Sequence, residues 1–178
     1  MNAPALPRSV SLFTGLPVTI GQVALFRERD SDAPFLRELY RSTRTEELAI
    51  TGWPDTVKRS FCDSQFDLQH AHYLRRHPAG EFLIIRSADI AIGRLYVDGS
   101  DSTVHLVDIA LLPAWRSLGI GSALLAALRQ RAAAIAKTLT LNVLAWNQRA
   151  IALYHRFGFV AGHSEGAHLT MHWDGDLN

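Results

Sequence analysis

The stretch that decides the fold is Arg-Ser-Leu-Gly-Ile-Gly-Ser at residues 116–122. It follows an apolar run typical of a β-strand and opens a run rich in Ala and Leu that is typical of a helix. The first N–H groups of a helix have no partner within it and lie at the positive end of its dipole, so they bind anionic phosphate. Gly119 and Gly121 let a phosphate approach the backbone without a Cβ in the way, and Arg116 adds a positive charge. The stretch therefore predicts a phosphate-binding loop between a strand and a helix.

Two other glycine-rich motifs are excluded by the residues around this loop. The dinucleotide fingerprint Gly-x-Gly-x-x-Gly needs a third glycine where this chain has Leu124, and the Gly-Lys-Ser/Thr ending of a P-loop is missing. Taken alone, the loop also fits a turn whose glycines only ease packing. A nucleotide-binding α/β protein that holds ATP at this loop is a more distant alternative.

A second segment, residues 138–159, combines a β-rich run with a short helix. Asn147 is a good N-cap residue and Gly158 is a good C-terminal stop. From Asn147 the chain reads Asn-x-x-Ala-x-x-Leu-Tyr-x-x-x-Gly-Phe. The segment therefore predicts a strand, a capped helix and a sharp exit, in that order.

The Arg-x-x-Gly-x-Gly loop and the Asn-to-Phe segment, in this order, resemble the GNAT superfamily of N-acetyltransferases. The resemblance covers roughly residues 80–175 by motif and residues 18–78 by the order of elements. It implies transfer of an acetyl group from acetyl-CoA to a primary amine by direct attack in a ternary complex. Acetyl-CoA is then a co-substrate, and this chemistry needs no metal.

The resemblance also implies where the cofactor lies. In this family two parallel strands splay apart, the pantetheine arm enters between them, and the glycine loop holds the pyrophosphate. The positions of this chain that match are Ile109, Ala110, Leu111, Arg116, Ser117, Leu118, Gly119, Ile120, Gly121, Ser122, Asn147, Ala150 and Tyr154. Asn147 also has the simpler role of capping its helix.

Tyr154 is the predicted general acid. Its position matches the tyrosine that protonates or hydrogen-bonds the leaving thiolate in this family. A tyrosine beside Leu153 also fits half-buried packing with a satisfied hydroxyl.

The general base has several candidates. Some family members carry a Glu where this chain has Asn142, which cannot accept the proton. Asp108 and His105 are three residues apart on the strand before the loop, so strict alternation puts them on opposite faces of the sheet. Apolar neighbours would raise the pKa of Asp108 and suit it to act as a catalytic base or as an anchor for the acceptor ammonium. A purely structural Asp108, or a water chain with no single base, are the alternatives.

Composition and charge fit one compact enzyme domain. The chain has 178 residues, 48% of them hydrophobic, and a net charge of +1, which argues against a nucleic-acid partner bound by bulk electrostatics. The single cysteine, Cys62, excludes an intramolecular disulfide and indicates a reducing compartment. No apolar run approaches the ~20 residues of a membrane span. We therefore expect a cytoplasmic protein with no membrane partner.

Alternating strands and helices predict one α/β (α+β) domain with a mixed central sheet of about six to seven strands flanked by helices. Residues 1–17 read as a flexible N-terminal arm and residues 18–178 as the acetyltransferase domain. Within it, residues 30–78 are the helices expected on the acceptor side. A strand is expected over 18–27 and helices over 33–43 and 55–76, with a separate helical turn at 46–50.

Two functions from different classes follow. The first is an active N-acetyltransferase whose acceptor is a small-molecule or protein amine. The second is a non-catalytic acyl-CoA-binding sensor or docking module, which the missing carboxylate at Asn142 favours. The resemblance also allows a homodimer formed through the C-terminal strands.

Overall fold

A computed structural model describes residues 11–99 and 102–175. The strands are β1 (Val18–Ile20), β2 (Val23–Arg27), β3 (Glu81–Ser87), β4 (Ile90–Gly99), β5 (Thr103–Leu111), β6 (Thr138–Leu144), β7 (Val160–Glu165) and β8 (His168–Trp173). The helices are α1 (Ala33–Ala49), α2 (Asp55–Arg76), α3 (Ile120–Ala134) and α4 (Gln148–Arg156). Within the described ranges, no helix is both long enough and apolar enough to cross a membrane.

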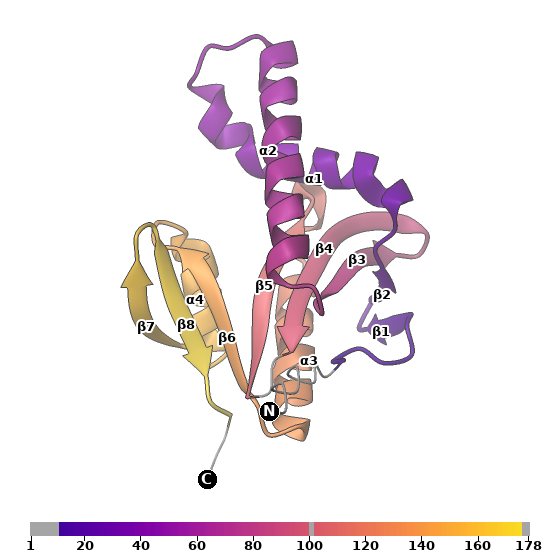
Figure 1. The fold of residues 1–178 in the computed structure, drawn as a ribbon, viewed down its shortest axis with the longest axis vertical. Helices are drawn as coiled ribbons and strands as arrows, with labels where there is room; N and C mark the ends of the chain where they lie inside the picture. Colours follow the sequence, from indigo (N-terminus) through magenta and orange to yellow (C-terminus); the bar gives the residue numbers. More distant parts are fainter. Residues whose placement is uncertain (1–10, 100–101, 176–178) are drawn as a thin grey trace, which may run out of the picture.

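All eight strands form one mixed sheet in the order β1-β2-β3-β4-β5-β6-β8-β7 (Figure 1). This exceeds the expected six to seven because the predicted strand over 18–27 is a hairpin. Gly21 has φ +59°, a left-handed conformation that reverses the chain so that Ile20 pairs with Val23. Mixed sheets of this kind need a crossover between parallel neighbours, and α3 supplies it between β5 and β6.

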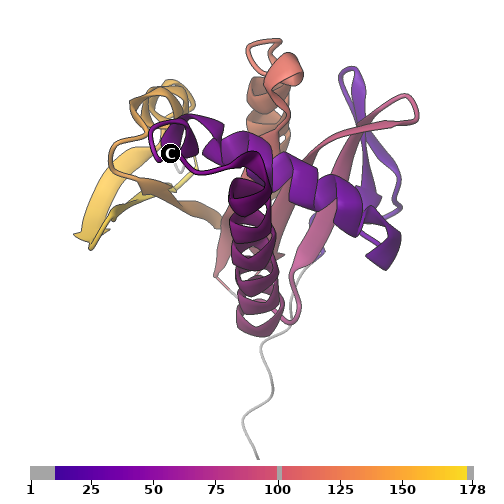
Figure 2. The same ribbon diagram turned by 90° about the horizontal axis from the view of Figure 1, so that it is seen from above.

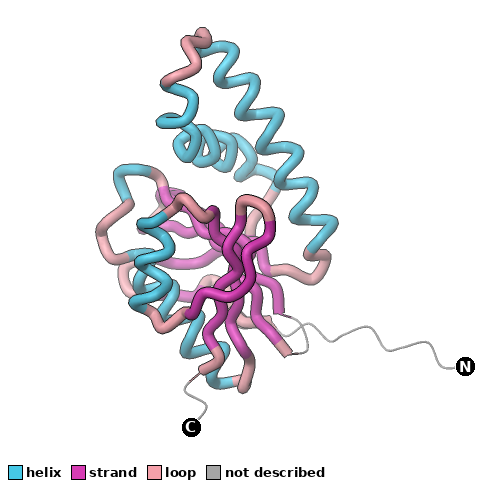
Figure 3. The backbone as a smooth tube through the Cα atoms, turned by 90° about the vertical axis from the view of Figure 1, so that its left-hand side faces the viewer, coloured by secondary structure: helices cyan, strands magenta, loops and turns pink. Residues whose placement is uncertain are grey.

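The helices cover both faces of the sheet (Figure 2). Leu124 of α3 and Tyr154 of α4 belong to one buried cluster, whereas Leu36 of α1 and Phe66 of α2 belong to another. α1 extends to Ala49 and takes in residues 46–49 of the helical turn expected separately at 46–50, since no Gly or Pro lies between Pro34 in its first turn and Gly52. α1 and α2 form a hairpin that projects beyond the sheet (Figure 3).

β5 and β6 are parallel neighbours that pair over four positions only. The register runs from Thr103↔Thr138 to Leu106↔Leu141, and then the strands separate toward the end of the sheet that α1 crosses (Figure 1). We call the gap between residues 107–111 of β5 and 142–144 of β6 the wedge. It is the splay between parallel strands that the family resemblance implied.

A β-bulge lies where the wedge begins. On β4, Val97 pairs with Leu106 and the preceding Tyr96 pairs with Asp108, so Val107 is the extra residue. His105 pairs with Asp98, two positions from Tyr96, and therefore lies on the same face of the sheet as Asp108. The prediction that these two side chains lie on opposite faces is wrong, because the bulge resets the alternation.

The described part of the predicted N-terminal arm packs on the core. Leu12 and Phe13 are 5% and 1% exposed, and their N–H groups donate to the Glu81 carboxylate at 2.5 and 3.2 Å. Arg131 of α3 donates to the Leu12 carbonyl at 2.6 Å. Burial of these two apolar side chains holds residues 11–13 against the core, and residues 1–10 lie outside the described ranges.

Gly93 sets how closely β4 approaches β5. A Cβ at this position would lie 2.3 Å from the carbonyl oxygen of Ala110 and 2.7 Å from Leu111 Cδ2. We predict that Gly93→Ala lowers the free energy of unfolding by about 2 kcal/mol, as overpacking does, measured by urea denaturation. The matched control is Gly162→Ala, whose Cβ meets its nearest atoms at 3.5 Å. Equal losses in the two variants would contradict the close approach.

Candidate functional site

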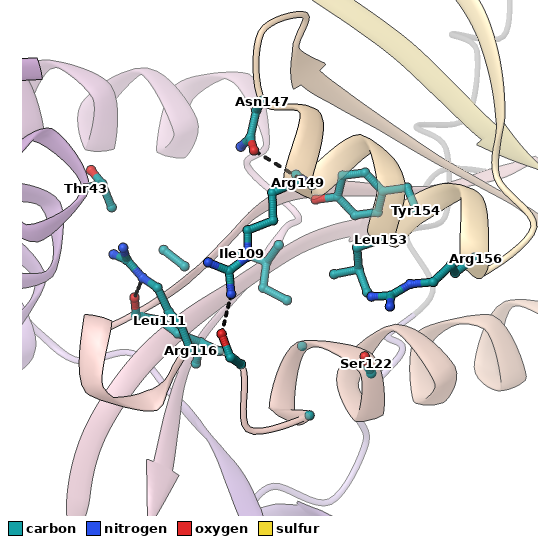
Figure 4. Close-up of a pocket in the computed structure, with 15 residues that line it drawn as sticks. Thr43, Ile109, Leu111, Arg116, Ser122, Asn147, Arg149, Leu153, Tyr154 and Arg156 are labelled. Atoms are coloured by element: carbon teal, nitrogen blue, oxygen red, sulfur yellow. Dashed lines mark hydrogen bonds between the residues drawn. The ribbon is translucent and has the colours of Figure 1, made fainter. Parts of the chain in front are cut away.

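A cavity of about 440 Å³ lies beside the wedge, between the start of α3, one face of α4 and the middle of α1 (Figure 4). Its size falls in the range of small-molecule sites. The residues that line it are Thr43, Ile109, Ala110, Leu111, Arg116, Ser117, Gly119, Gly121, Ser122, Asn147, Arg149, Ala150, Leu153, Tyr154 and Arg156.

All but two of the residues predicted at the cofactor line this cavity. Leu118 is 55% exposed and points away from the fold, whereas Ile120 is 2% exposed and belongs to the core under α3. Both side chains are therefore outside the cavity, although their backbone belongs to the loop.

The glycine loop presents free amides to the cavity. Gly119 has φ +81° and is the N-cap of α3, and Ser117 is also left-handed at φ +64°. The first helical hydrogen bond runs from Ala123 N–H to the Gly119 carbonyl at 2.9 Å. The amides of residues 120–122 precede that bond, so they have no acceptor within the helix. The structure thus has the predicted loop between a strand and a helix, and free amides at a helix start are a general means of binding anions.

Arg116 ties the loop to its surroundings. Its Nε donates to the Leu111 carbonyl at 2.8 Å, and its Nη2 lies 3.5 Å from Ser42 Oγ on α1. Leu111 therefore turns its carbonyl away from β4. Because backbone groups two residues apart point to the same side of a strand, the N–H and C=O of Ile109 also face the wedge. The wall of the wedge is thus polar backbone.

α4 forms the opposite wall. Asn147 Oδ1 accepts from Ala150 N–H at 3.1 Å, which confirms the predicted N-cap (Figure 4). Arg149, Leu153 and Arg156 also line the cavity and were missed by the sequence analysis. Helical spacing was an available signal, because Leu153 lies three residues after Ala150, with Arg149 four residues before Leu153 and Arg156 three residues after it. Thr43 was missed too, and it had no signal because it comes from α1.

Tyr154 places a proton donor in the cavity. It is 8% exposed, and its hydroxyl makes no hydrogen bond with another residue in the described part of the chain. Burial, and then the negative charge of Asp108, raise the pKa of Tyr154 to about 12. The hydroxyl is therefore protonated at neutral pH and is available to a bound molecule.

The structure corrects the expected surroundings of Asp108. Its Oδ2 lies 2.5 Å from Nη2 of Arg94, whose side chain is 4% exposed, so the carboxylate sits in an ion pair rather than among apolar groups. Burial, and then the charge of Asp108, raise the pKa of the Tyr73 hydroxyl on α2. Asp108 does not line the cavity, and it faces the α1 and α2 side of the sheet.

The other base candidates lie elsewhere. His105 is at the closed end of the wedge, where its ring stacks on His77 at 6.0 Å and its Nδ1 lies 3.0 Å from Thr140 Oγ1. Burial, and then the charge of His77, lower the pKa of His105. Asn142 accepts from Thr170 Oγ1 at 2.8 Å. Residues 11–99 and 102–175 contain no group of three or more His, Cys, Asp or Glu side chains that could hold a metal.

The acetyltransferase (GNAT) family profile matches residues 34–159, which include the glycine loop, the wedge and α4. The chain belongs to this family. A comparison with curated proteins gives no match.

Solved structures share the GNAT fold. PaiA N-acetyltransferase from Thermoplasma acidophilum, in complex with coenzyme A, is 17% identical with a TM-score of 0.64, covering 85% of this chain and 98% of that one. The putative acetyltransferase yncA from Salmonella typhimurium, with acetyl-CoA, is 19% identical with a TM-score of 0.56, covering 89% and 96%. An acetyltransferase from Salmonella typhimurium that modifies the N-terminal serine of ribosomal protein L7/L12 is 14% identical with a TM-score of 0.60, covering 95% and 100%. At these identities the likeness shows the fold.

The ion pair between Arg94 and Asp108 yields a stability prediction. Removing one partner of a buried pair leaves an uncompensated charge, so we expect Asp108→Ala to lower the free energy of unfolding by about 3 kcal/mol. Asp67→Ala is the matched control, because the Arg37–Asp67 pair is 36% and 53% exposed and should cost less than about 1 kcal/mol.

Urea denaturation measures both losses. Replacing Arg94 by Met in the Asp108→Ala background should recover part of the stability, since it removes the orphaned charge. Equal losses for Asp108→Ala and Asp67→Ala would contradict the buried pair.

Proposed function

We propose that this GNAT protein is an N-acetyltransferase that transfers the acetyl group of acetyl-CoA to a primary amine by direct attack in a ternary complex. The observation that carries the proposal is one cavity with two chemically different ends. One end offers the free amides of residues 120–122, and the other offers the unbonded, protonated hydroxyl of Tyr154.

The cavity wall fits an extended thioester cofactor. The loop amides and Arg116 would hold the pyrophosphate, as helix N-termini hold phosphates in general. The wedge-facing N–H and C=O of Ile109 would pair with the amide groups of the pantetheine arm. The arm would then lead the thioester toward Asn147 and Tyr154 on α4.

The acceptor would enter from the opposite face of the sheet. α3 and α4 cover one face and α1 and α2 the other, and the cavity reaches both sets of helices, because Thr43 of α1 lines it together with residues of α3 and α4. An alkyl ammonium has a pKa of about 10.4 and must lose a proton before it attacks. We assign Asp108, which faces the α1 and α2 side, as the anion that attracts this ammonium, with the proton leaving through water.

Tyr154 would act at the leaving group. As the amine nitrogen bonds to the carbonyl carbon and the C–S bond breaks, negative charge develops on sulfur. A hydroxyl with a pKa of about 12 donates a hydrogen bond to that sulfur, or its proton as the thiolate leaves. The product is an N-acetyl amide and free coenzyme A.

A non-catalytic acyl-CoA-binding module is the second candidate. The observation that favours it is that no Asp or Glu lines the cavity among the described residues, and that Asn142 is engaged by Thr170. With either candidate we propose a reducing compartment such as the cytoplasm, which the use of a single cysteine, Cys62, supports.

A thermal-shift titration tests cofactor binding. Acetyl-CoA at about 100 times its Kd should stabilise the folded state by about 2.7 kcal/mol, which corresponds to a rise in melting temperature of roughly 5–10 °C for a chain of this size. ATP should cause little shift. The absence of a shift with acetyl-CoA, or a larger shift with ATP, would overturn the proposed cofactor.

Replacing Tyr154 by Phe tests the chemistry. We expect turnover with a primary amine to fall roughly 100-fold, as when a general acid is lost, while the Kd for acetyl-CoA changes little. Release of coenzyme A measures turnover, and calorimetry measures Kd. The matched control is Tyr40→Phe, which removes a buried hydroxyl outside the cavity that accepts from Arg44.

The outcomes separate the two candidates. Normal turnover in Tyr154→Phe would contradict the role of the acid. The wild type would be tested with small amines and with peptides that have free N-termini. If it binds acetyl-CoA but acetylates none of them, the result would favour the binding module.

A further inference from the structure

One face of α4 turns two arginines toward the cavity. Arg149, Leu153 and Arg156 follow at spacings of four and three residues, so they lie on the same side of the helix. Both arginines stand at positions that the Asn-to-Phe motif quoted above leaves open. Together with Arg116 they bring three positive charges to the cavity, and within the described part of the chain no carboxylate lines it.

These three arginines differ in their partners. Arg116 is bound to Leu111 and Ser42, and Arg149 donates to Ser117 Oγ at 2.5 Å, beside the glycine loop. Arg156, in contrast, has no hydrogen bond or ion pair with another described residue. Figure 4 shows its guanidinium extending from α4 toward α3, on the side where Ser122 lies. The cavity therefore has an uncommitted cation apart from the glycine loop.

A structural role for Arg156 is the simpler alternative. Arg156 is the last residue of α4, where a cation stabilises the negative end of the helix dipole. That role needs no particular direction of the side chain. It does not explain why the guanidinium of Arg156 points across a cavity that Arg116 and Arg149 also line. Like charges around one cavity repel one another unless an anion lies among them. A bound anion is the arrangement that relieves this repulsion.

We propose that Arg156, with the hydroxyl of Ser122, forms a second anion subsite that binds the ribose 3′-phosphate of the coenzyme A moiety. This inference rests on the proposed function. Coenzyme A carries negative charge at two separate places, the pyrophosphate and the 3′-phosphate. The glycine loop accounts for the first, and the uncommitted guanidinium on the facing helix accounts for the second.

The chemistry of the two groups suits a phosphate monoester. A guanidinium offers paired N–H donors that match two phosphate oxygens, and a serine hydroxyl adds a third donor. Arg149 has a different role, because it is bonded to the loop at Ser117. It should support the pyrophosphate, which every form of the cofactor carries.

Calorimetric titration with coenzyme A and with 3′-dephospho-coenzyme A tests the subsite, because the ligands differ only in the 3′-phosphate. We expect the wild type to bind coenzyme A about tenfold more tightly, as for a charge-assisted hydrogen bond. Arg156→Ala should abolish this preference and leave the Kd of dephospho-coenzyme A unchanged, and Arg156→Lys should keep part of it. Arg149→Ala should weaken both ligands by a similar factor.

Arg76→Ala is the matched control, because Arg76 is the exposed last residue of α2 and carries the same helix-end charge outside the cavity. It should leave both Kd values unchanged. The preference for coenzyme A should also shrink as salt rises from about 0.05 M to about 0.5 M.

Equal affinities of the wild type for the two ligands would overturn the subsite, and so would an equal loss for both ligands in Arg156→Ala. In either case binding of coenzyme A would still support the proposed function. Failure of both ligands to bind the wild type would instead remove the proposed function, and the subsite with it.

Discussion

The hydrogen-bonded pairing between β5 and β6 stops after four positions, and the site depends on that stop. Beyond Leu106 the backbone of β5 has β4 on one side and no strand on the other. The groups of Ile109 that face the wedge need partners, because unpaired backbone amides and carbonyls are costly away from water. The extra residue of the bulge, Val107, lies where the strands part. An extended ligand with amide groups can complete the sheet there, as a short strand would.

Local signals in the sequence predicted much of the fold. Residues 55–76 follow Pro54 and end just before His77-Pro78, two signals that mark the observed bounds of α2, and the glycine loop was predicted from its helix-opening pattern. The bulge was not predicted, since it depends on how β5 meets β4 and leaves no mark in the residues of β5 alone. As a result, strict alternation gave the wrong relation between His105 and Asp108.

The candidate site likewise has one part that the sequence could predict and another part that it could not. The α4 wall follows from helical spacing: Leu153 lies three residues after Ala150, and Arg149 and Arg156 lie four residues before and three residues after Leu153. The ion pair of Asp108 could not be predicted, because Arg94 lies on a different strand and sequence gives no register between strands. Nor did the motif show that the side chain of Arg116 reaches α1. That contact joins the phosphate-binding loop to the helices on the other face of the sheet.

The projecting α1–α2 hairpin divides the molecule into parts that evolution can change separately (Figure 3). Its base is held by buried side chains such as Leu36 and Phe66, whereas at its tip Ile50 is 89% exposed and Trp53 is 41% exposed. Substitutions at the tip therefore remove little buried area from the fold and do not touch the glycine loop. A lineage could exchange the tip for another sequence and acquire a new molecular partner while inheriting the cavity intact.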